Sequence, residues 1–224
     1  MSHTPSTFYP TFVTEMAQSQ FLQPLSNPGD DLQSRVGLEL KFGERTVRLI
    51  HVLGSGSYGA VYLATDSVDQ IHYAVKYLKW YINDDPRFKI RIPREVQLHC
   101  EVSGHENIVS LLGSTQGLDG YYILLEYCSG GDLFQHIKKG LFIRDDAFIR
   151  TRFLQILDAV KHCHDRGIYH RDLKLENIFV TGSEQLKLGD FGSATVGNLC
   201  KEDPCGPNIM LSPGKSLGEI LELH

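Results

Sequence analysis

The chain has 224 residues, enough for one sizeable globular core or for one core with a tail. Apolar residues make up 42% and the formal net charge is only -5, which excludes a wholly disordered or fibrous protein. No apolar stretch is long enough to cross a bilayer, and five irregularly spaced cysteines argue against a disulfide framework. We expect a cytoplasmic or nuclear protein, with neither nucleic acid nor a membrane as a partner.

The first part of the chain reads as a tail. Residues 1–43 are rich in Ser, Thr, Pro and Gln, and their few apolar residues follow no regular period. We expect them to be disordered and an ordered domain to cover residues 44–224. In that domain, β-prone runs at Arg48–Leu53 and Val61–Thr65 flank a glycine-rich hexad, and a third run follows at Ile71–Leu78.

A helix and a hairpin are expected next. Pro93 suits the first position of a helix and Gly104 suits the residue past its end. Val109–Leu112 and Tyr121–Glu126 are separated by turn residues, which predicts a β-hairpin.

The pattern then becomes helical, with a long helix predicted over Asp146–Arg166. Its apolar residues recur at spacings of 3 and 4 and predict one buried face: Phe148, Phe153, Ile156, Leu157 and Val160. The fold class is therefore α+β, with a β-rich lobe over residues 44–128 and a helical lobe over residues 129–224.

The glycine-rich hexad is the first motif with chemical meaning. Gly54, Gly56 and Gly59 would let the backbone bend over a phosphate chain and present its N–H groups. Taken alone, the hexad is also compatible with a glycine-rich hairpin turn.

Lys76 closes the third β-prone run beside this loop. A cation on an apolar strand needs an anionic partner, which phosphate oxygens and a helix carboxylate would supply. Glu95 is the favoured carboxylate, because Glu101 lies close to the end of the predicted helix. A solvated lysine at a strand end is the alternative.

The densest group of polar residues lies between Tyr169 and Asn177. Asp172, Lys174 and Asn177 fall within six residues, and Asp190 follows a later apolar run. Two carboxyl groups and an amide are hard oxygen ligands, suited to Mg²⁺ that bridges phosphates.

In this order, from about Arg48 to Phe191, the motifs resemble the eukaryotic protein kinase family. The position of Lys174, two residues after Asp172, resembles the pattern of the serine/threonine class of that family. The resemblance implies a two-lobed kinase-like fold that binds ATP and Mg²⁺ and phosphorylates protein substrates. It also implies that Asp172 is the catalytic base, that Lys174 steadies the transferred phosphoryl group, and that Asn177 and Asp190 hold Mg²⁺.

The resemblance further implies which residues bind ATP. The three glycines would cover the phosphates, and Lys76, paired with Glu95, would hold the α- and β-phosphates. The remaining assignments are Val61 and Ala74 on the adenine ring, Leu125 as gatekeeper, Glu126 to Cys128 as the adenine-reading hinge, and Asp132 at the ribose. Thr195 is a candidate for phosphorylation near Arg171, and Arg94 belongs to a basic run that we expect to be solvated.

The match weakens after Phe191. Pro207 replaces a Ser or Thr of the family pattern, Gly214 replaces a glutamate, and the helices that complete the large lobe are not found. We expect a complete small lobe and a truncated large lobe. The leading hypothesis is a serine/threonine protein kinase, and the alternative is a non-catalytic ATP-binding or interaction module.

Overall fold

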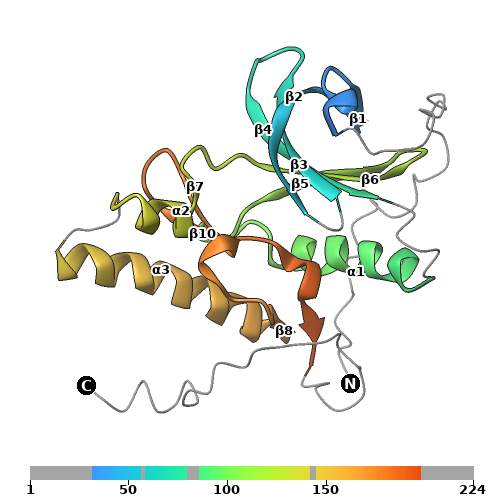
Figure 1. The fold of residues 1–224 in the computed structure, drawn as a ribbon. Helices are drawn as coiled ribbons and strands as arrows, with labels where there is room; N and C mark the ends of the chain where they lie inside the picture. The colour runs from blue at the N-terminus through green and yellow to red at the C-terminus, as the bar shows by residue number, and fades with distance from the viewer. Residues whose placement is uncertain (1–31, 57–58, 80–85, 142–144, 198–224) are drawn as a thin grey trace, which may run out of the picture.

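A computed structural model of the chain describes residues 32–56, 59–79, 86–141 and 145–197 (Figure 1). Pro207 and Gly214 lie outside these residues, as does the tip of the glycine-rich loop at residues 57–58. The described part has a β-rich upper lobe and a lower lobe that contains the long helix α3 (Figure 1).

The upper lobe is built on a six-stranded antiparallel sheet in the order β1-β2-β3-β4-β6-β5. The predicted runs around the glycine hexad and the third run after them all lie in this sheet. The strand bounds are β1 (Glu39–Phe42), β2 (Arg45–Gly56), β3 (Gly59–Asp66), β4 (His72–Lys79), β5 (Leu111–Gln116) and β6 (Gly120–Glu126).

Strand β4 shows how the two faces of this sheet differ. Successive side chains of a strand point to opposite faces, so Val75 and Tyr77 enter the buried core while Ala74 and Lys76 share the other face. A Cβ atom added at Gly113 of β5 would contact Phe42 of β1, so the two edge strands approach each other. The sheet therefore curves around its core, and on the face that carries Lys76 the side chain of Leu78 packs against Ile92.

The expectation of a tail over residues 1–43 is wrong for residues 32–42. The 3₁₀ turn η2 (Leu32–Arg35) and β1 belong to the domain. Arg35 is 5% exposed, and its guanidinium donates to Asp119 Oδ2 at 2.6 Å and to Tyr77 Oη at 2.8 Å. Strand β1 has only four residues, and its apolar side chains bury against residues distant in sequence, which a local reading of composition does not reveal.

The prediction that the first helix begins at Pro93 is also wrong. Helix α1 spans Pro86–Val102 and contains Pro93 in its interior. A proline there removes one backbone hydrogen bond. Ile92, Leu98 and Val102 of the same helix are nevertheless buried, and this packing offsets the loss.

The segment Asn107–Ser110 is a loop where part of a strand was expected, because β5 begins only at Leu111. Its backbone bonds to β10 (Leu186–Leu188): Val109 N–H donates to Leu188 O at 2.9 Å, and Leu188 N–H to Asn107 O at 2.8 Å. Ser110 O accepts from Glu126 N–H at 2.9 Å. This loop therefore ties the upper lobe to a strand of the lower lobe.

The lower lobe combines helices with short strands. Strands β10, β9 and β7 form one small sheet, and β11 pairs with β8 in another. The bounds are α2 (Leu133–Lys138), α3 (Asp146–Asp165), β7 (Gly131–Asp132), β8 (Ile168–Tyr169), β9 (Ile178–Val180), β11 (Thr195–Val196), η3 (Leu175–Asn177) and η4 (Phe191–Ser193). No helix of the described residues has the length and apolar character needed to span a membrane.

The predicted buried face of α3 is only partly buried. Val160, Ala159 and Cys163 pack in a cluster with Ile168 and Leu188. Toward the helix N-terminus, Phe153 is 57% exposed, and Ile149 and Leu154 are exposed as well. The periodicity correctly indicated a helix, but only its C-terminal half packs against the described residues.

His99 anchors α1 at its C-terminal end. Its Nε2 donates to Val109 O at 2.6 Å, because a carbonyl oxygen only accepts, and its ring lies 4.6 Å from that of Phe191. Burial lowers the pKa of His99 to about 4, and the charge of Lys76 acts in the same direction. The neutral imidazole is therefore the form that the fold holds at neutral pH.

We expect Phe42→Ala to lower the free energy of unfolding by about 3 kcal/mol, because it leaves a cavity where β1 meets the core. Lys41→Ala is the matched control, since Lys41 is an exposed residue of the same strand, and its effect should stay within about 0.5 kcal/mol. Denaturant unfolding measures both. Equal stabilities of the two variants would contradict the inclusion of β1 in the fold.

Acid should destabilise the protein through His99. Between pH 6.5 and 4 the unfolded chain binds a proton at this residue and the folded protein does not, so stability falls as the pH drops. His99→Gln retains an N–H donor but does not titrate. From pH 7 to pH 5, the difference in unfolding free energy between wild type and variant should move by about 2 kcal/mol in favour of the variant. An unchanged difference in denaturant unfolding would refute this account.

Candidate functional site

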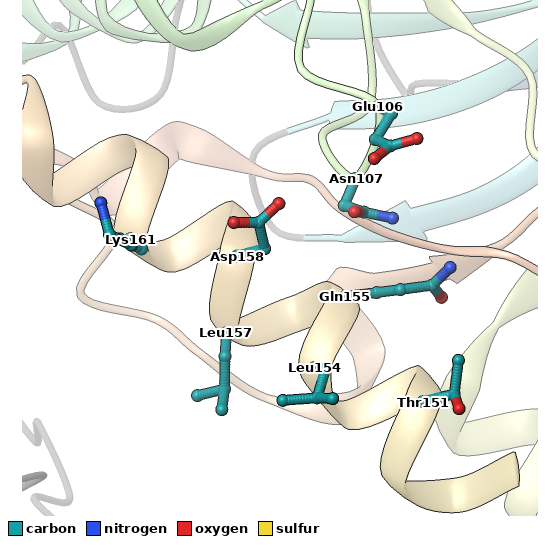
Figure 2. Close-up of a pocket in the computed structure, with 8 residues that line it drawn as sticks. All are labelled: Glu106, Asn107, Thr151, Leu154, Gln155, Leu157, Asp158 and Lys161. Carbon is teal, nitrogen blue, oxygen red and sulfur yellow. The ribbon is translucent and has the colours of Figure 1, made fainter.

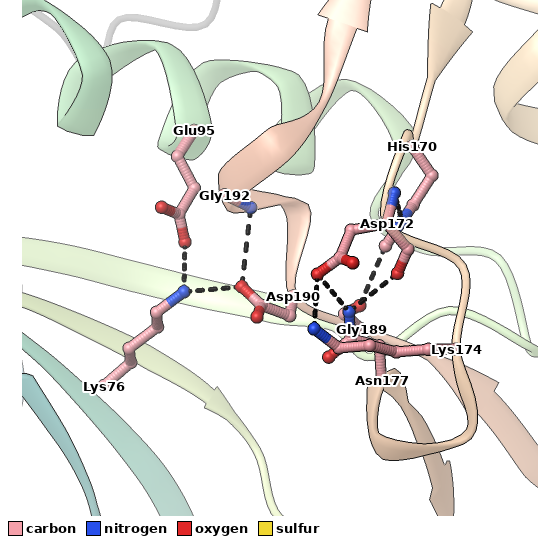
Figure 3. Close-up of polar contacts among 9 residues, drawn as sticks. All are labelled: Lys76, Glu95, His170, Asp172, Lys174, Asn177, Gly189, Asp190 and Gly192. Atoms are coloured by element: carbon pink, nitrogen blue, oxygen red, sulfur yellow. Dashed lines mark hydrogen bonds and ion pairs between the residues drawn. The ribbon is translucent and has the colours of Figure 1, made fainter. Parts of the chain in front are cut away.

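Lys76 is the meeting point of three elements. From β4, its Nζ donates to Glu95 Oε1 of α1 at 2.6 Å and to Asp190 Oδ1 at 2.7 Å (Figure 3). Burial alone would lower the pKa of Lys76, but the charges of Glu95 and Asp190 outweigh it and raise the pKa above its ordinary value. The lysine is therefore held as a cation beside two carboxylates.

Between the two candidate acids on α1, the structure selects Glu95. The Glu95 side chain is buried, whereas Glu101 Oε1 accepts a hydrogen bond from Gln97 on the same helix. A Cβ atom added at Gly192 would lie 3.1 Å from Glu95 Oε2, so the turn after Asp190 packs closely against this carboxylate.

Asp172, Lys174 and Asn177 form one hydrogen-bonded group (Figure 3). Asp172 Oδ2 accepts from Lys174 Nζ at 2.7 Å and from Asn177 Nδ2 at 3.0 Å, and Asn177 Nδ2 also donates to the Asp172 carbonyl at 2.8 Å. The hydrogen bond to Asp172 raises the pKa of Lys174. The carboxylate of Asp172 is thus held in a defined orientation by two donors.

His170 and Gly189 connect this group to Asp190. His170 Nε2 donates to Gly189 O at 2.9 Å and its Nδ1 accepts from Asp172 N–H at 3.3 Å, which fixes a neutral imidazole with the proton on Nε2. Burial lowers the pKa of His170, in agreement with that form. Gly189 N–H also donates to Asn177 O at 2.9 Å.

The β9–β10 pairing explains why the two groups meet. The strands are antiparallel, with Ile178 opposite Leu188, so Asn177 before β9 and Gly189 after β10 lie at the same end of the pair. Asp190 follows directly and turns its carboxylate toward Lys76.

The backbone is strained at two positions beside these residues. Asp190 has φ 59° and ψ 75°, and Arg171 has φ 67°, in the left-handed region that most side chains avoid. Such strain gathers at functional sites. Partial burial would raise the pKa of Asp190, but the charge and hydrogen bond of Lys76 outweigh it, so the pKa lies below its ordinary value and the carboxylate is ionised.

The glycine-rich loop and the predicted adenine-binding residues lie on the same sheet. Gly54 and Gly56 are in the last part of β2, and Gly59 begins β3, where a Cβ atom would collide with the Tyr77 carbonyl oxygen. Val61 stands opposite Lys76 across the β3–β4 pairing, and Ala74 stands opposite Leu125 across the β4–β6 pairing. Residues directly opposite share a face, so Val61, Ala74 and Leu125 lie on the same side as Lys76.

The hinge residues differ in what they offer. Glu126 Oε2 accepts from Ser110 N–H at 3.1 Å and from Lys187 Nζ at 2.9 Å, so the side chain is turned toward β10. Any adenine contact at Glu126 would therefore come from its backbone. Cys128 is buried, which raises the pKa of its thiol to about 12. Asp132 Oδ1 accepts from Gln135 N–H at 2.8 Å and caps the start of α2.

Two contacts, made by Lys187 and by Arg94, could not be predicted from the sequence. Lys187, which ties the hinge to β10, carried no motif that singled it out. Arg94 was expected to be solvated, but its Nη2 donates to Thr195 Oγ1 at 2.7 Å. Thr195 is 4% exposed, so phosphorylation there would require β11 to separate from β8. A lone arginine in a basic run gives no signal for such a partner.

A cavity of about 490 Å³ lies elsewhere, between α3 and the loop before β5 (Figure 2). None of the predicted site residues lines it, and its walls are polar and apolar side chains of α3 with those of the loop: Glu106, Asn107, Thr151, Leu154, Gln155, Leu157, Asp158 and Lys161. The cavity is therefore separate from the group around Lys76.

Known proteins are similar to this chain in sequence. The "Negative regulator of sexual conjugation and meiosis" of Schizosaccharomyces pombe is 41% identical over 171 residues, which are 75% of this chain and 36% of that protein. Mouse "Serine/threonine-protein kinase Nek1" is 40% identical over 162 residues, 71% of this chain and 13% of that protein. "Serine/threonine-protein kinase chk-1" of Caenorhabditis elegans is 33% identical over 156 residues, 68% and 31% of the two chains.

The chain thus spans between 13% and 36% of the length of these relatives. The family described as protein kinase domain matches residues 47–213. That range contains both Lys76 and the loop with Asp172, and the chain belongs to the protein kinase domain family.

Proposed function

We propose that this chain binds ATP with Mg²⁺ between its two lobes and transfers the γ-phosphoryl group to serine or threonine hydroxyls of protein substrates. The observation that carries the proposal is the contact of Lys76 with both Glu95 and Asp190. This contact keeps the Lys76 ammonium group charged, as binding of phosphate oxygens would require. It also places Lys76 beside Asp190, the carboxylate that we assign to Mg²⁺. Relatives named serine/threonine-protein kinases support the substrate class.

The residues at the site fit a magnesium ion. The Asp190 side chain is 42% exposed, and the side-chain hydrogen bonds that Asn177 makes to other described residues use Nδ2, which leaves its side-chain amide oxygen for a cation. The described residues contain no cluster of three His, Cys, Asp or Glu side chains suited to a metal, so water and phosphate oxygens would complete the coordination. When bound, Mg²⁺ neutralises charge on the phosphates.

In the proposed reaction, Asp172 accepts the proton of the substrate hydroxyl as that oxygen bonds to the γ-phosphorus and the bond to the β-phosphate oxygen breaks. Lys174 and Asn177 keep the Asp172 carboxylate in place through their hydrogen bonds. The Lys174 ammonium lies beside Asp172, and the phosphoryl group would be transferred next to that residue. Lys174 would therefore also stabilise negative charge on the transferred group.

The nucleotide would lie against the face of the sheet that carries Lys76. Gly54, Gly56 and Gly59 would cover its phosphates, because backbone N–H groups bind phosphate where no side chain intervenes. The adenine would lie against Val61 and Ala74 and contact the backbone from Glu126 to Cys128, with Asp132 near the ribose. Asp132 has a second carboxylate oxygen for that contact besides the one that caps α2.

We also expect the chain to work in the cytoplasm or nucleus. Cys100, Cys128 and Cys163 are free thiols in the described part of the chain, as suits a reducing compartment.

Asp172→Asn tests the proposal. The amide cannot accept the hydroxyl proton, so we expect kcat for phosphorylation of a generic Ser/Thr protein substrate to fall by at least about 100-fold. The Kd for an ATP analogue with Mg²⁺ should change less than about twofold, since the proposed role of Asp172 is in the reaction. Radiolabelled phosphate transfer and calorimetry measure the two quantities.

Asp165→Asn is the matched control, because Asp165 is an exposed carboxylate at the C-terminal end of α3 that pairs with Lys161 away from the site. Its kcat should equal that of wild type. Transfer that survives unchanged in Asp172→Asn, or wild-type transfer no greater than that of Asp172→Asn, would reject the proposed function.

A further inference from the structure

Arg94 joins α1 to the strand pair below it. It stands immediately before Glu95 on α1, and its Nη2 donates to Thr195 Oγ1 at 2.7 Å. Thr195 lies in β11 and pairs with Tyr169 of β8, the strand that leads into His170 and Asp172. One turn of α1 therefore contacts Lys76 through Glu95, and through Arg94 it contacts Thr195, whose strand pairs with the strand that leads to Asp172.

The two contacts point in different directions. Neighbouring residues of an α-helix are about 100° apart around its axis. The His99 contact with Val109 holds the C-terminal end of α1, and the Lys76–Glu95 contact holds one side of the turn before it. The contact at Arg94, on another side of that turn, adds resistance to rotation of the helix about its own axis. Thr195 is buried, and its strand β11 pairs with β8. The Arg94 side chain is therefore bonded to a residue that the fold holds in place.

We propose that Arg94 is a positioning residue that, through its hydrogen bond to the Thr195 hydroxyl, holds α1 in the rotation at which Glu95 meets Lys76. Thr195 then serves as an internal hydrogen-bond acceptor. The inference rests on the proposed function for its consequence in catalysis, but the contact also acts in the protein without nucleotide. A hydrogen bond from a charged donor is among the stronger ones, and its loss changes a local equilibrium by about 10-fold or more.

The test compares variants that differ in one hydroxyl. Thr195→Val keeps the branched shape of the side chain and removes the acceptor, whereas Thr195→Ser keeps the acceptor. Arg94→Met removes the donor and retains a long side chain. Gln97→Met is the control on the exposed part of α1, where Gln97 contacts Glu101. Hydrogen exchange of the α1 amides in the nucleotide-free full chain is the first measurement.

We expect α1 amides to exchange about 10-fold faster in Thr195→Val and Arg94→Met, while the amides of β2 and β3 keep their wild-type rates. Thr195→Ser and Gln97→Met should match wild type. The double variant Arg94→Met/Thr195→Val should be no worse than the more affected single variant, because both changes remove the same bond.

Phosphate transfer is the second measurement. For Thr195→Val we expect kcat to fall about 10-fold with the KM for ATP changed less than about twofold, and Thr195→Ser should restore kcat. If wild type transfers no phosphate, the proposed function fails while the exchange data still decide the role of Arg94. Wild-type exchange of α1 in Thr195→Val, or faster exchange spread equally over β2 and β3, would overturn the inference.

Discussion

The need of one half-buried lysine, Lys76, for negative charge organises the site. Lys76 lies on β4 between Val75 and Tyr77, which are buried, and a cation there is costly unless carboxylates approach it. Glu95 arrives on α1 and Asp190 arrives at the end of the β9–β10 pair, so three separate elements must take their places for the charge to be balanced. The position of α1 between the lobes is therefore required by the charge of Lys76 as well as by apolar packing.

Residues whose chemistry depends on a local pattern could be predicted from the sequence. The glycine spacing, the lysine at the end of an alternating run and the density of polar residues from Asp172 to Asn177 each pointed to the site, and the structure brings Lys76, Glu95 and Asp190 into contact. Glu95 was preferred to Glu101 from its place along the predicted helix alone. Strands β2, β3, β4 and β6 of the small-lobe sheet followed from β-prone runs and turn residues for the same reason.

What could not be predicted depends on partners distant in the chain. Strand β1 is four residues long, and Arg35 finds Tyr77 and Asp119 only after the sheet has curved. Pro93 looked like a helix start because local rules give proline that place, yet the packing of α1 decides otherwise. The contact of Arg94 with Thr195 spans a sequence separation of 101 residues, and neither residue carries a local sign of it.

The loop Asn107–Ser110 has a consequence for how the two lobes can move. Besides the covalent hinge near Cys128, this loop is bonded on one side to Leu188 of β10 and on the other to the first hinge residue, Glu126. The covalent connection near Cys128 and the loop Asn107–Ser110 are thus two attachments between the lobes, and together they define an axis of rotation. Relative rotation of the lobes about that axis would change the separation between the face of the sheet that carries Lys76 and the loop that carries Asp172.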